Sequence, residues 1–266
     1  MLIAERRSRI LAHVRARGWA SFREIAEEVG ISESTVRRDL QAMVAEGLVD
    51  AVRGGVGRAG STEIAPPESR PAGNPAGDGL AGERAAIARY AARLVTDGSA
   101  ILLGPGRSTL ELARRLTGAG SLTVVTNSVP VTTVLLEHEH VELVMVGGTL
   151  RRSIQAFVGP LTEQGLQGLR GAQVFLSGDG VTAERGLTTP NVFAAAADIA
   201  FAAAGKQVVV LADHTKIGQE TMCQTVPSDR IDTLITTPGA DPVALEDLRA
   251  SGVDVVIAPP LESIDK

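Results

Sequence analysis

Apolar residues recur at helical spacing within the first thirty residues of the chain. They predict two amphipathic helices, from the positions of Ile3, Ile10, Leu11, Val14, Phe22, Ile25, Ala26 and Val29. Gly18 and Gly30 mark the ends of these helices. Ser21 with Glu24 makes a capping box at the start of the second helix.

A third helix follows after a very short connection. It begins at Ser32, which can cap it, and runs to about Glu46, before Gly47. Only Gly30-Ile31-Ser32 separates it from the second helix, so the later helix has the spacing that lets it lie in the major groove of DNA. Three short helices in under fifty residues therefore favour a helix-turn-helix.

Beyond residue 80, short apolar runs alternate with helical patterns. The runs are Ala100–Leu103, Leu122–Thr126, Val141–Val146, Val174–Ser177, Val208–Ala212, Thr233–Thr236 and Val253–Ala258. They are rich in Val, Ile and Leu without polar alternation, which is typical of strands buried on both faces. This part of the chain is therefore predicted to be a mostly parallel α/β sheet.

Residues 59–79 separate the two patterns. This stretch has four prolines, four glycines and few apolar residues, which predicts a linker. The alternative is a long surface loop within one domain. The predicted division is a DNA-binding domain at 1–58, a linker at 59–79 and an α/β effector-sensing domain at 80–266.

The third helix has two different faces. Val36, Leu40 and Met43 lie on one side and can pack against the preceding helices. The outward-facing residues on the other side are Ser34, Arg37, Arg38 and Gln41. A guanidinium can bridge two acceptors on guanine or clamp a phosphate, so this face is a candidate DNA-reading surface. For an isolated pair of arginines, an ordinary solvated charged face is the alternative.

A short extended run at 48–58 follows the third helix and leads into a glycine turn. It predicts a wing whose backbone amides and Arg53 contact phosphate or the minor groove. It can equally be the first turn of the linker. With the wing, the predicted fold class is α/β: an N-terminal winged helix-turn-helix domain plus a C-terminal, mostly parallel α/β sheet sensor domain.

The run Ser-Glu-Ser-Thr-Val-Arg-Arg-Asp-Leu at 32–40, with Glu46-Gly47-Leu48 and Arg53-Gly54-Gly55, resembles the helix-turn-helix signature of the DeoR family of bacterial sugar-metabolism regulators. The resemblance implies that the third helix is the recognition helix. The candidate DNA-binding residues are Ser32, Ser34, Thr35, Arg37, Arg38, Gln41 and Arg53. The chain departs from the family in the wing, where Ala51 and Arg53 stand in place of the usual Arg then His.

The first predicted strand of the α/β segment ends in the glycine loop Gly104-Pro105-Gly106-Arg107-Ser108-Thr109, which opens into a helix. Free amides at a helix N-terminus, two hydroxyls and Arg107 suit a phosphate. A tight strand-to-helix turn is the alternative. A dinucleotide fingerprint fails, because Thr109 stands at the third glycine position and the next strand lacks a ribose-binding acid at its end. No cofactor is expected.

Other strand ends carry polar or glycine-rich loops, at 126–128, 147–148, 177–180 and 213–216. Ligands of open α/β sheets gather at the carboxyl ends of the strands. Lys216 would supply a cation for phosphate and Asp179 an acceptor for sugar hydroxyls; a surface lysine and a turn former are the alternatives. The candidate effector-binding residues are Gly104, Gly106, Arg107, Ser108, Thr109, Thr126, Asn127, Ser128, Gly147, Gly148, Asp179, Gly180 and Lys216.

The blocks at 122–128, 147–151, 179–180 and 211–216 are similar to the sensor domain of the same family, so the resemblance extends from Leu2 to about Thr237. It implies a domain like the sugar-phosphate isomerases of the ribose-5-phosphate type, with phosphorylated sugars as effectors. There are two departures. Gly104 begins the loop where the family commonly has Asp-x-Gly-Thr-Thr, and an alanine near Ala197 replaces a frequent lysine. The lost acid and the gained Arg107 indicate a more anionic or atypical effector.

Charge and composition narrow the picture further. The net charge is −5, yet residues 1–58 hold ten arginines and eight acidic residues, so the head is weakly basic and the rest acidic. A single cysteine, Cys223, excludes an internal disulfide and a zinc cluster. The first twenty residues lack the apolar core of a secretory signal, and no stretch approaches the ~20 apolar residues of a membrane span. A cytoplasmic location is expected.

Together these features predict a sequence-specific DNA-binding transcriptional regulator of carbohydrate metabolism, by resemblance a repressor, controlled by a phosphorylated sugar-type effector. The expected partners are double-stranded operator DNA and that effector, with no membrane and no metal. A homo-oligomer is expected because operators are usually read by symmetric dimers. The alternatives are an active sugar-phosphate isomerase or transferase, for which Gly104 stands where a carboxylate would be useful, and a sensor that has lost its ligand.

Overall fold

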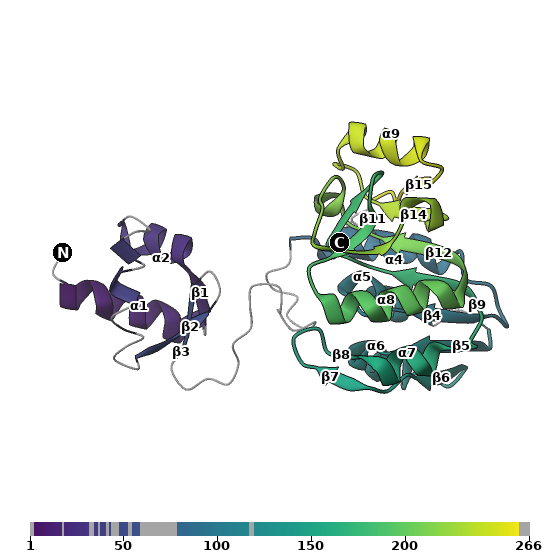
Figure 1. Cartoon of the computed structure of the whole chain (residues 1–266), viewed down its shortest axis with the longest axis horizontal. Coiled ribbons are helices and arrows are strands. Elements are labelled where there is room, and N and C mark those ends of the chain that lie inside the picture. The colour runs from purple at the N-terminus through teal and green to yellow at the C-terminus, as the bar shows by residue number, and fades with distance from the viewer. Residues whose placement is uncertain are drawn as a thin grey trace, which may run out of the picture. The chain divides into compact units, whose positions relative to one another are not determined.

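The computed structural model describes residues 3–17, 19–31, 35–36, 38–40, 43, 48–52, 55–58, 79–116 and 120–260. The chain divides into two units, Met1–Arg70 and Pro71–Lys266 (Figure 1). The predicted linker at 59–79 lies outside the described residues except for Gly79, and the predicted domain boundaries stay a prediction. None of the helices in the described part of the chain has the length and apolar character needed to cross a bilayer.

The N-terminal unit is a small helical domain with a three-stranded sheet. Its elements are α1 (Ile3–Arg17), β1 (Trp19–Ser21), α2 (Phe22–Val29), β2 (Val49–Val52) and β3 (Gly55–Arg58). The strands are antiparallel in the order β1-β3-β2, and β2 pairs with β3 as a hairpin. The hairpin confirms the predicted wing over the alternative of a linker turn. The sequence did not predict β1, which ends at Ser21 directly before α2.

A single apolar core holds this unit together. It contains most of the residues that the helical spacing predicted, together with Ala20, Val49 and Val56 from the strands. Its buried members are Ile10, Val14, Ala20, Ile25, Val29, Val36, Leu40, Met43, Val49 and Val56. Gly30 ends α2 as predicted, since its φ of 72° lies in the left-handed region and its amide bonds back to Ala26 O at 2.9 Å. The described residues between 35 and 43 are helical.

The C-terminal unit is built on a seven-stranded sheet in which every strand pair is parallel. Its spatial order is β15-β14-β12-β9-β4-β5-β6. The strands are β4 (Ala100–Leu103), β5 (Leu122–Thr126), β6 (Val141–Met145), β9 (Gly171–Leu176), β12 (Gly205–Leu211), β14 (Thr233–Thr236) and β15 (Asp254–Ile257). All seven predicted strands are present, which confirms the α/β fold class.

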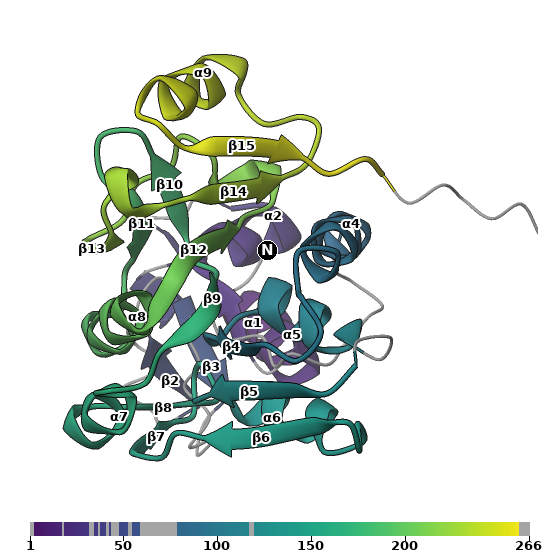
Figure 2. The ribbon, with the colours of Figure 1, turned by 90° about the vertical axis from the view of Figure 1, so that its right-hand side faces the viewer.

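Helices cover both faces of this sheet (Figure 2). They are α4 (Ala81–Ala92), α5 (Arg107–Ala113), α6 (Val129–Leu135), α7 (Pro160–Leu166), α8 (Val192–Ala204) and α9 (Pro242–Ala250). Ile101 and Leu103 of β4 pack in one core with α4 and α5, while Leu102 packs in the other with Phe201 of α8. Because alternate side chains of a strand point to opposite faces, β4 is buried on both sides, as its unbroken apolar run predicted.

Two small antiparallel sheets flank the main one, and the sequence predicted neither. The strands are β7 (Thr149–Arg151) and β8 (Ala156–Val158), which form a hairpin, and β10 (Gly180–Thr182), β11 (Gly186–Thr189) and β13 (Cys223–Val226). Short 3-10 helices lie at His214–Lys216 and Ser228–Arg230. Strands of three or four residues with Gly and Thr carry little apolar periodicity, which is why the pattern missed them.

Candidate functional site

The predicted recognition helix, which we call the recognition segment, is described at residues 35–36, 38–40 and 43, and this part presents an exposed arginine. Val36, Leu40 and Met43 are at most 2% exposed and pack in the core, whereas Arg38 is exposed. Two residues on from Val36, the side chain of Arg38 points about 200° around a helix of 3.6 residues per turn. The predicted division of the helix into a packed face and an outward face therefore holds for these four residues.

The remaining predicted DNA-binding residues are placed less fully. Thr35 is helical and half-buried. Five others lie outside the described residues: Ser32, Ser34, Arg37, Gln41 and Arg53. Their DNA contacts, like that of Arg38, stay predictions.

A partly buried ion pair that the sequence did not predict joins this helical segment to α1. Asp39 is 6% exposed and accepts hydrogen bonds from the Nε and Nη2 of Arg6, the latter at 2.9 Å. The bond to Asp39 also raises the pKa of Arg6. Since Arg6 lies on α1 and Asp39 follows Arg38 directly, the pair ties α1 to the residue next to the exposed arginine.

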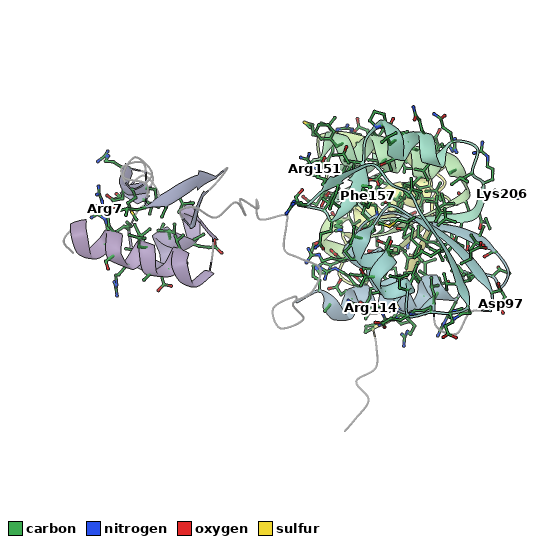
Figure 3. The ribbon with its side chains drawn as sticks, turned by 90° about the horizontal axis from the view of Figure 1, so that it is seen from below. Arg7, Asp97, Arg114, Arg151, Phe157 and Lys206 are labelled. Atoms are coloured by element: carbon green, nitrogen blue, oxygen red, sulfur yellow. The ribbon has the colours of Figure 1, made fainter. Side chains whose placement is uncertain are left out.

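In the C-terminal unit, a change of direction in the strand order marks the candidate effector site. From β4 the chain adds β5 and β6 on one side, whereas β9, β12, β14 and β15 extend the sheet on the other. Ligands of open α/β sheets bind outside the carboxyl ends of strands at such a switch point. In Figure 3, Asp97 and Lys206, at the amino ends of β4 and β12, lie at the opposite end of the unit from Arg151, in the hairpin that follows the carboxyl end of β6.

The loops after β4 and β9 are packed against each other. The amide of Gly104 donates to Phe175 O at 3.0 Å, and a Cβ on Gly104 would lie 2.6 Å from Leu176 Cδ2. Gly106 has a φ of 150°, and its Cβ would lie 3.0 Å from Ser177 Cβ. The two predicted glycines therefore permit a close approach of the loops, because neither position has room for an ordinary side chain.

Lys216 joins the loop after β12 to the loop after β9. Its ammonium donates to Gly178 O at 2.6 Å and to Ser177 Oγ at 3.4 Å. Burial lowers the pKa of Lys216; the Asp213 and Asp179 carboxylates act in the opposite direction, and Arg84 and Arg107 lower it further. Lys216, Asp179 and Arg107, which the sequence assigned to one site on three loops, thus lie within electrostatic reach of one another.

Two carboxyl groups lie near this junction, of which the sequence predicted one. Asp179 is exposed, and its Oδ2 accepts from Thr189 Oγ1 at 3.1 Å. Asp198 on α8 is 4% exposed, and burial followed by the charge of Asp179 raises its pKa well above the ordinary value. Asp198 was missed because it occupies one position in an apolar helix; a lone acid in the run Val-Phe-Ala-Ala-Ala-Ala-Asp was the available signal.

Arg84 and Glu83 on α4 support the β12 loop and were also missed. Arg84 Nε lies 3.8 Å from Asp213 Oδ2, and both side chains are buried. Glu83 accepts from His214 Nδ1 at 2.8 Å and from the hydroxyl of Thr237. Burial raises the pKa of Glu83, but the bonds from His214 and Thr237 outweigh it and the net shift is downward. The helix that follows the predicted linker therefore positions the segment carrying Lys216.

Several predicted site residues are engaged within the protein. Thr126 Oγ1 donates to Leu103 O at 2.7 Å, Asn127 Nδ2 to Phe157 O at 2.7 Å, and Ser128 Oγ caps α6 by accepting from Val131 N. All three predicted side chains are at most 2% exposed. Their clearest role in this structure is to hold the end of β5 and the start of α6.

The hydroxyls at the start of α5 differ from each other. Thr109 is fully buried and donates to Gly106 O at 3.0 Å, which closes the glycine loop. Ser108 is 1% exposed, and its Oγ has no hydrogen-bond partner in the part of the chain that the structure describes. Arg107 is exposed.

Gly147 and Gly148 lie at the far end of the row of strands. Gly147 O accepts a hydrogen bond from Thr162 Oγ1 at 2.9 Å, and a Cβ on Gly148 would lie 2.2 Å from Thr162 Oγ1. Four strand steps separate β6 from β12, which is about 19 Å at the usual strand spacing. The described contacts thus bring together the loops after β4, β9 and β12, and they place the two glycines against α7. Within the described ranges, no group of three or more His, Cys, Asp or Glu side chains could hold a metal ion.

Two family models match the chain. One, described as a DeoR-like helix-turn-helix domain, matches residues 6–62, and the other, described as the DeoR C terminal sensor domain, matches residues 81–237. A helix-turn-helix of this type implies DNA as a partner, and the sensor domain implies a small-molecule effector.

Full-length relatives agree with these matches. The regulator GlpR of Haloferax volcanii is 32% identical over 96% of this chain and 98% of its own, and UlaR of Escherichia coli O1:K1 / APEC is 30% identical over 96% and 99%. IolR of Bacillus subtilis is 28% identical over 91% and 92%. Among solved structures, ribose 5-phosphate isomerase A of Methanocaldococcus jannaschii overlaps 50% of this chain and 52% of its own at 19% identity and a TM-score of 0.37, a likeness too partial to indicate a shared activity. The chain belongs to the DeoR family of sequence-specific, DNA-binding transcriptional regulators.

Proposed function

We propose that this protein represses genes of carbohydrate metabolism and leaves its operator when a phosphorylated sugar-type effector binds at the carboxyl ends of β4, β9 and β12. The position of Lys216 is the observation that carries the proposal. Its ammonium bridges the β9 loop at Gly178 O, within electrostatic reach of Asp179 and Arg107. The ammonium of Lys216 therefore links the loop after β12 to the loop after β9, and β9 pairs with β4, from which the sheet extends in both directions.

The chemistry of these groups suits a phosphorylated sugar. Lys216 and Arg107 supply positive charge for the phosphate, and Arg107 is exposed where a ligand can reach it. Asp179 offers an exposed carboxylate, which accepts hydrogen bonds from sugar hydroxyls. Because the ammonium of Lys216 is held by a backbone carbonyl, a phosphate that draws it away would shift the loop after β9.

Such a shift gives a physical route from effector to DNA. An effector changes operator affinity only if it binds the DNA-bound and the released states with different affinities. The β9 and β12 loops are joined by the side chain of Lys216, so a ligand that replaces this bond stabilises a different loop arrangement. We propose that this arrangement disfavours operator binding.

The test compares two lysines at opposite ends of the same strand. Lys216 follows β12, whereas Lys206 lies near its amino end and is exposed. Operator fragments are first recovered from genomic DNA, and their release from the protein is then followed by fluorescence anisotropy as ribose 5-phosphate, glucose 6-phosphate, fructose 6-phosphate or glycerol 3-phosphate is added. For Lys216→Gln we expect the effective concentration to rise by roughly tenfold or more, through loss of a charge-assisted bond.

Lys206→Gln also removes one positive charge, and it is expected to release operator DNA at the same effector concentration as the unaltered protein. Equal responses of both variants would contradict the assignment of Lys216. Failure of every phosphorylated sugar to change operator binding or thermal stability of the unaltered protein would favour a sensor without a ligand, since a bound ligand raises stability by mass action.

We also propose that the protein acts as a homo-oligomer held by its C-terminal unit. Operators are commonly read by symmetric dimers. Three large apolar side chains are exposed on neighbouring elements, with Leu150 at 46%, Leu161 at 68% and Phe193 at 56%. The guanidinium of Arg151 lies 4.8 Å from the centre of the Phe193 ring, so the β7–β8 hairpin and the start of α8 form one surface. Light scattering after gel filtration should give a dimer or larger, and Phe193→Asp should lower the mass.

We propose that the sensor binds its effector without chemical turnover. The full-length relatives named above are regulators, and Gly104 leaves the first loop without a carboxylate for proton transfer. Incubation with ribose 5-phosphate, followed by NMR, should leave the sugar unchanged. Turnover that Asp179→Asn abolishes would contradict this part of the proposal.

A further inference from the structure

Asp198 is a buried carboxyl group in surroundings that do not explain it. It is the one polar residue in the thirteen-residue helix α8, whose other members are Ala, Val, Phe and Ile. The side chain is 4% exposed, and its Oδ1 has no hydrogen-bond partner among the residues that the structure describes. An unpartnered buried carboxyl destabilises a fold, and such exceptions call for a functional explanation.

The unpartnered oxygen faces the candidate effector site. Asp198 Oδ1 lies 3.9 Å from the point that a Cβ on Gly104 would occupy. Gly104 begins the loop after β4 at the topological switch point and is packed against β9 through Phe175 O. The same point lies 2.6 Å from Leu176 Cδ2, the far end of a flexible side chain, so Leu176 must shift for a ligand group to stand between this loop and the carboxyl of Asp198.

The environment also favours the neutral form of the carboxyl. Burial, and then the nearby charge of Asp179, raises the pKa of Asp198 well above its ordinary value. A protonated carboxyl has one O–H donor and retains acceptor capacity, so it can exchange two hydrogen bonds with an alcohol. An ammonium group would instead require the ionised form, which burial disfavours.

We propose that Asp198 is a specificity-determining residue of the effector site, and that its carboxyl exchanges hydrogen bonds with a sugar hydroxyl held at the Gly104 loop. The inference rests on the proposed function and deepens it. A phosphate is held on the side of Lys216 and Arg107, whereas the hydroxyl-bearing carbon skeleton extends toward α8. Asp198 of α8 would thus bind the sugar hydroxyl, because Gly104 in the loop after β4 has no side chain to do so.

The experiment uses the full-length protein with Asp198→Ala, Asp198→Asn and the control Asp247→Asn, an exposed aspartate of α9. Release from operator DNA and thermal stabilisation are measured with the four phosphorylated sugars named above and with inorganic phosphate. The sugar phosphate that acts at the lowest concentration on the unaltered protein is then compared with its deoxy and amino-deoxy analogues.

The proposal predicts that Asp198→Ala weakens the sugar response by roughly tenfold or more, because one or both of the exchanged hydrogen bonds are lost. Asp198→Asn, which keeps a neutral donor and acceptor, should stay within about threefold. Asp247→Asn should match the unaltered protein. Inorganic phosphate should bind all variants equally, because its contacts lie at Lys216 and Arg107. One deoxy analogue should act on the unaltered protein as weakly as the parent sugar acts on Asp198→Ala.

Several outcomes would overturn the inference while leaving the proposed function intact. An unchanged response of Asp198→Ala would remove Asp198 from the site. An equal loss in Asp198→Asn, or tighter binding of an amino analogue than of its parent, would show that the carboxyl serves a cation. If Asp198→Ala also binds the operator more weakly without effector, the Asp198→Asn variant and the deoxy analogues decide whether Asp198 contacts the sugar. An unaltered protein that responds to no sugar phosphate would contradict the proposed function and the inference with it.

Discussion

The two units differ in how far the charged residues of their candidate sites are exposed. In the N-terminal unit, Arg38 is exposed on a helix whose other face is buried in the core. In the C-terminal unit, Arg84, Asp198 and Asp213 are at most 5% exposed and lie around the carboxyl ends of the strands. A duplex is large and approaches from outside, whereas a small effector is largely surrounded, so a DNA site needs exposed charge and an effector site also needs charge within the protein.

This difference also decides how much of each site the sequence predicts. Helical periodicity separates Val36, Leu40 and Met43 from Arg38, and the structure confirms that separation. Buried charges have no such periodicity. Asp198 lies in an apolar helix, and only the fold brings its carboxyl near Gly104, which is 94 residues earlier in the chain.

For the fold as well, the sequence predicted some strands and missed others. Seven strands were predicted because burial on both faces gives unbroken apolar runs, as in β4 and β14. β1 and the strands from β7 to β13 outside the main sheet were missed, because short strands with polar residues depend on tertiary pairing. The buried hydrogen bonds of Thr126 and Ser128 likewise follow from packing and leave no mark in the sequence.

The largest expected effect is the loss of the effector response when Gly106 is replaced. In Gly106→Ala the added Cβ lies 3.0 Å from Ser177 Cβ at a φ of 150°, which costs on the order of 1–3 kcal/mol and moves the two loops apart. We expect the effector response to be lost and operator binding to be kept, as measured by anisotropy with and without sugar phosphates.

Gly98→Ala is the matched control for that variant. Gly98 also has a positive φ, of 74°, but its Cβ would meet nothing within 4 Å. It should show the backbone strain as a lower Tm while the effector response remains. A lost response in both variants would mean that general destabilisation, and not the β4–β9 contact, is responsible.

The next effect concerns the ion pair beneath the recognition segment. Asp39→Asn leaves Arg6 without its ionic partner and should lower the thermal transition of the N-terminal unit by several degrees. Effector binding, read by thermal stabilisation of the C-terminal unit, should not change. Glu28→Gln, at an exposed carboxylate of α2, serves as the control. If Asp39→Asn melts like Glu28→Gln, the pair does not stabilise the segment.

The smallest expected effect is a pH dependence of stability. Because the pKa of Asp198 is raised in the folded state, its contribution to stability is complete below the unfolded pKa of about 3.9 and is lost as pH rises toward the folded value. Between pH 5 and pH 7, the Tm of the unaltered protein should therefore fall relative to that of Asp198→Asn as pH rises. A constant difference across this range would contradict the raised pKa of this buried carboxyl.

The most direct test of the whole account is the salt dependence of operator binding in Arg38→Ala. We expect its operator affinity to fall by roughly tenfold to a hundredfold, in line with about 1–3 kcal/mol for an arginine contact to a base. Arg249→Ala, an exposed arginine of α9, changes the net charge equally and should bind like the unaltered protein. Equal operator affinity and equal salt slopes for all three proteins would contradict the assignment of this helix to DNA.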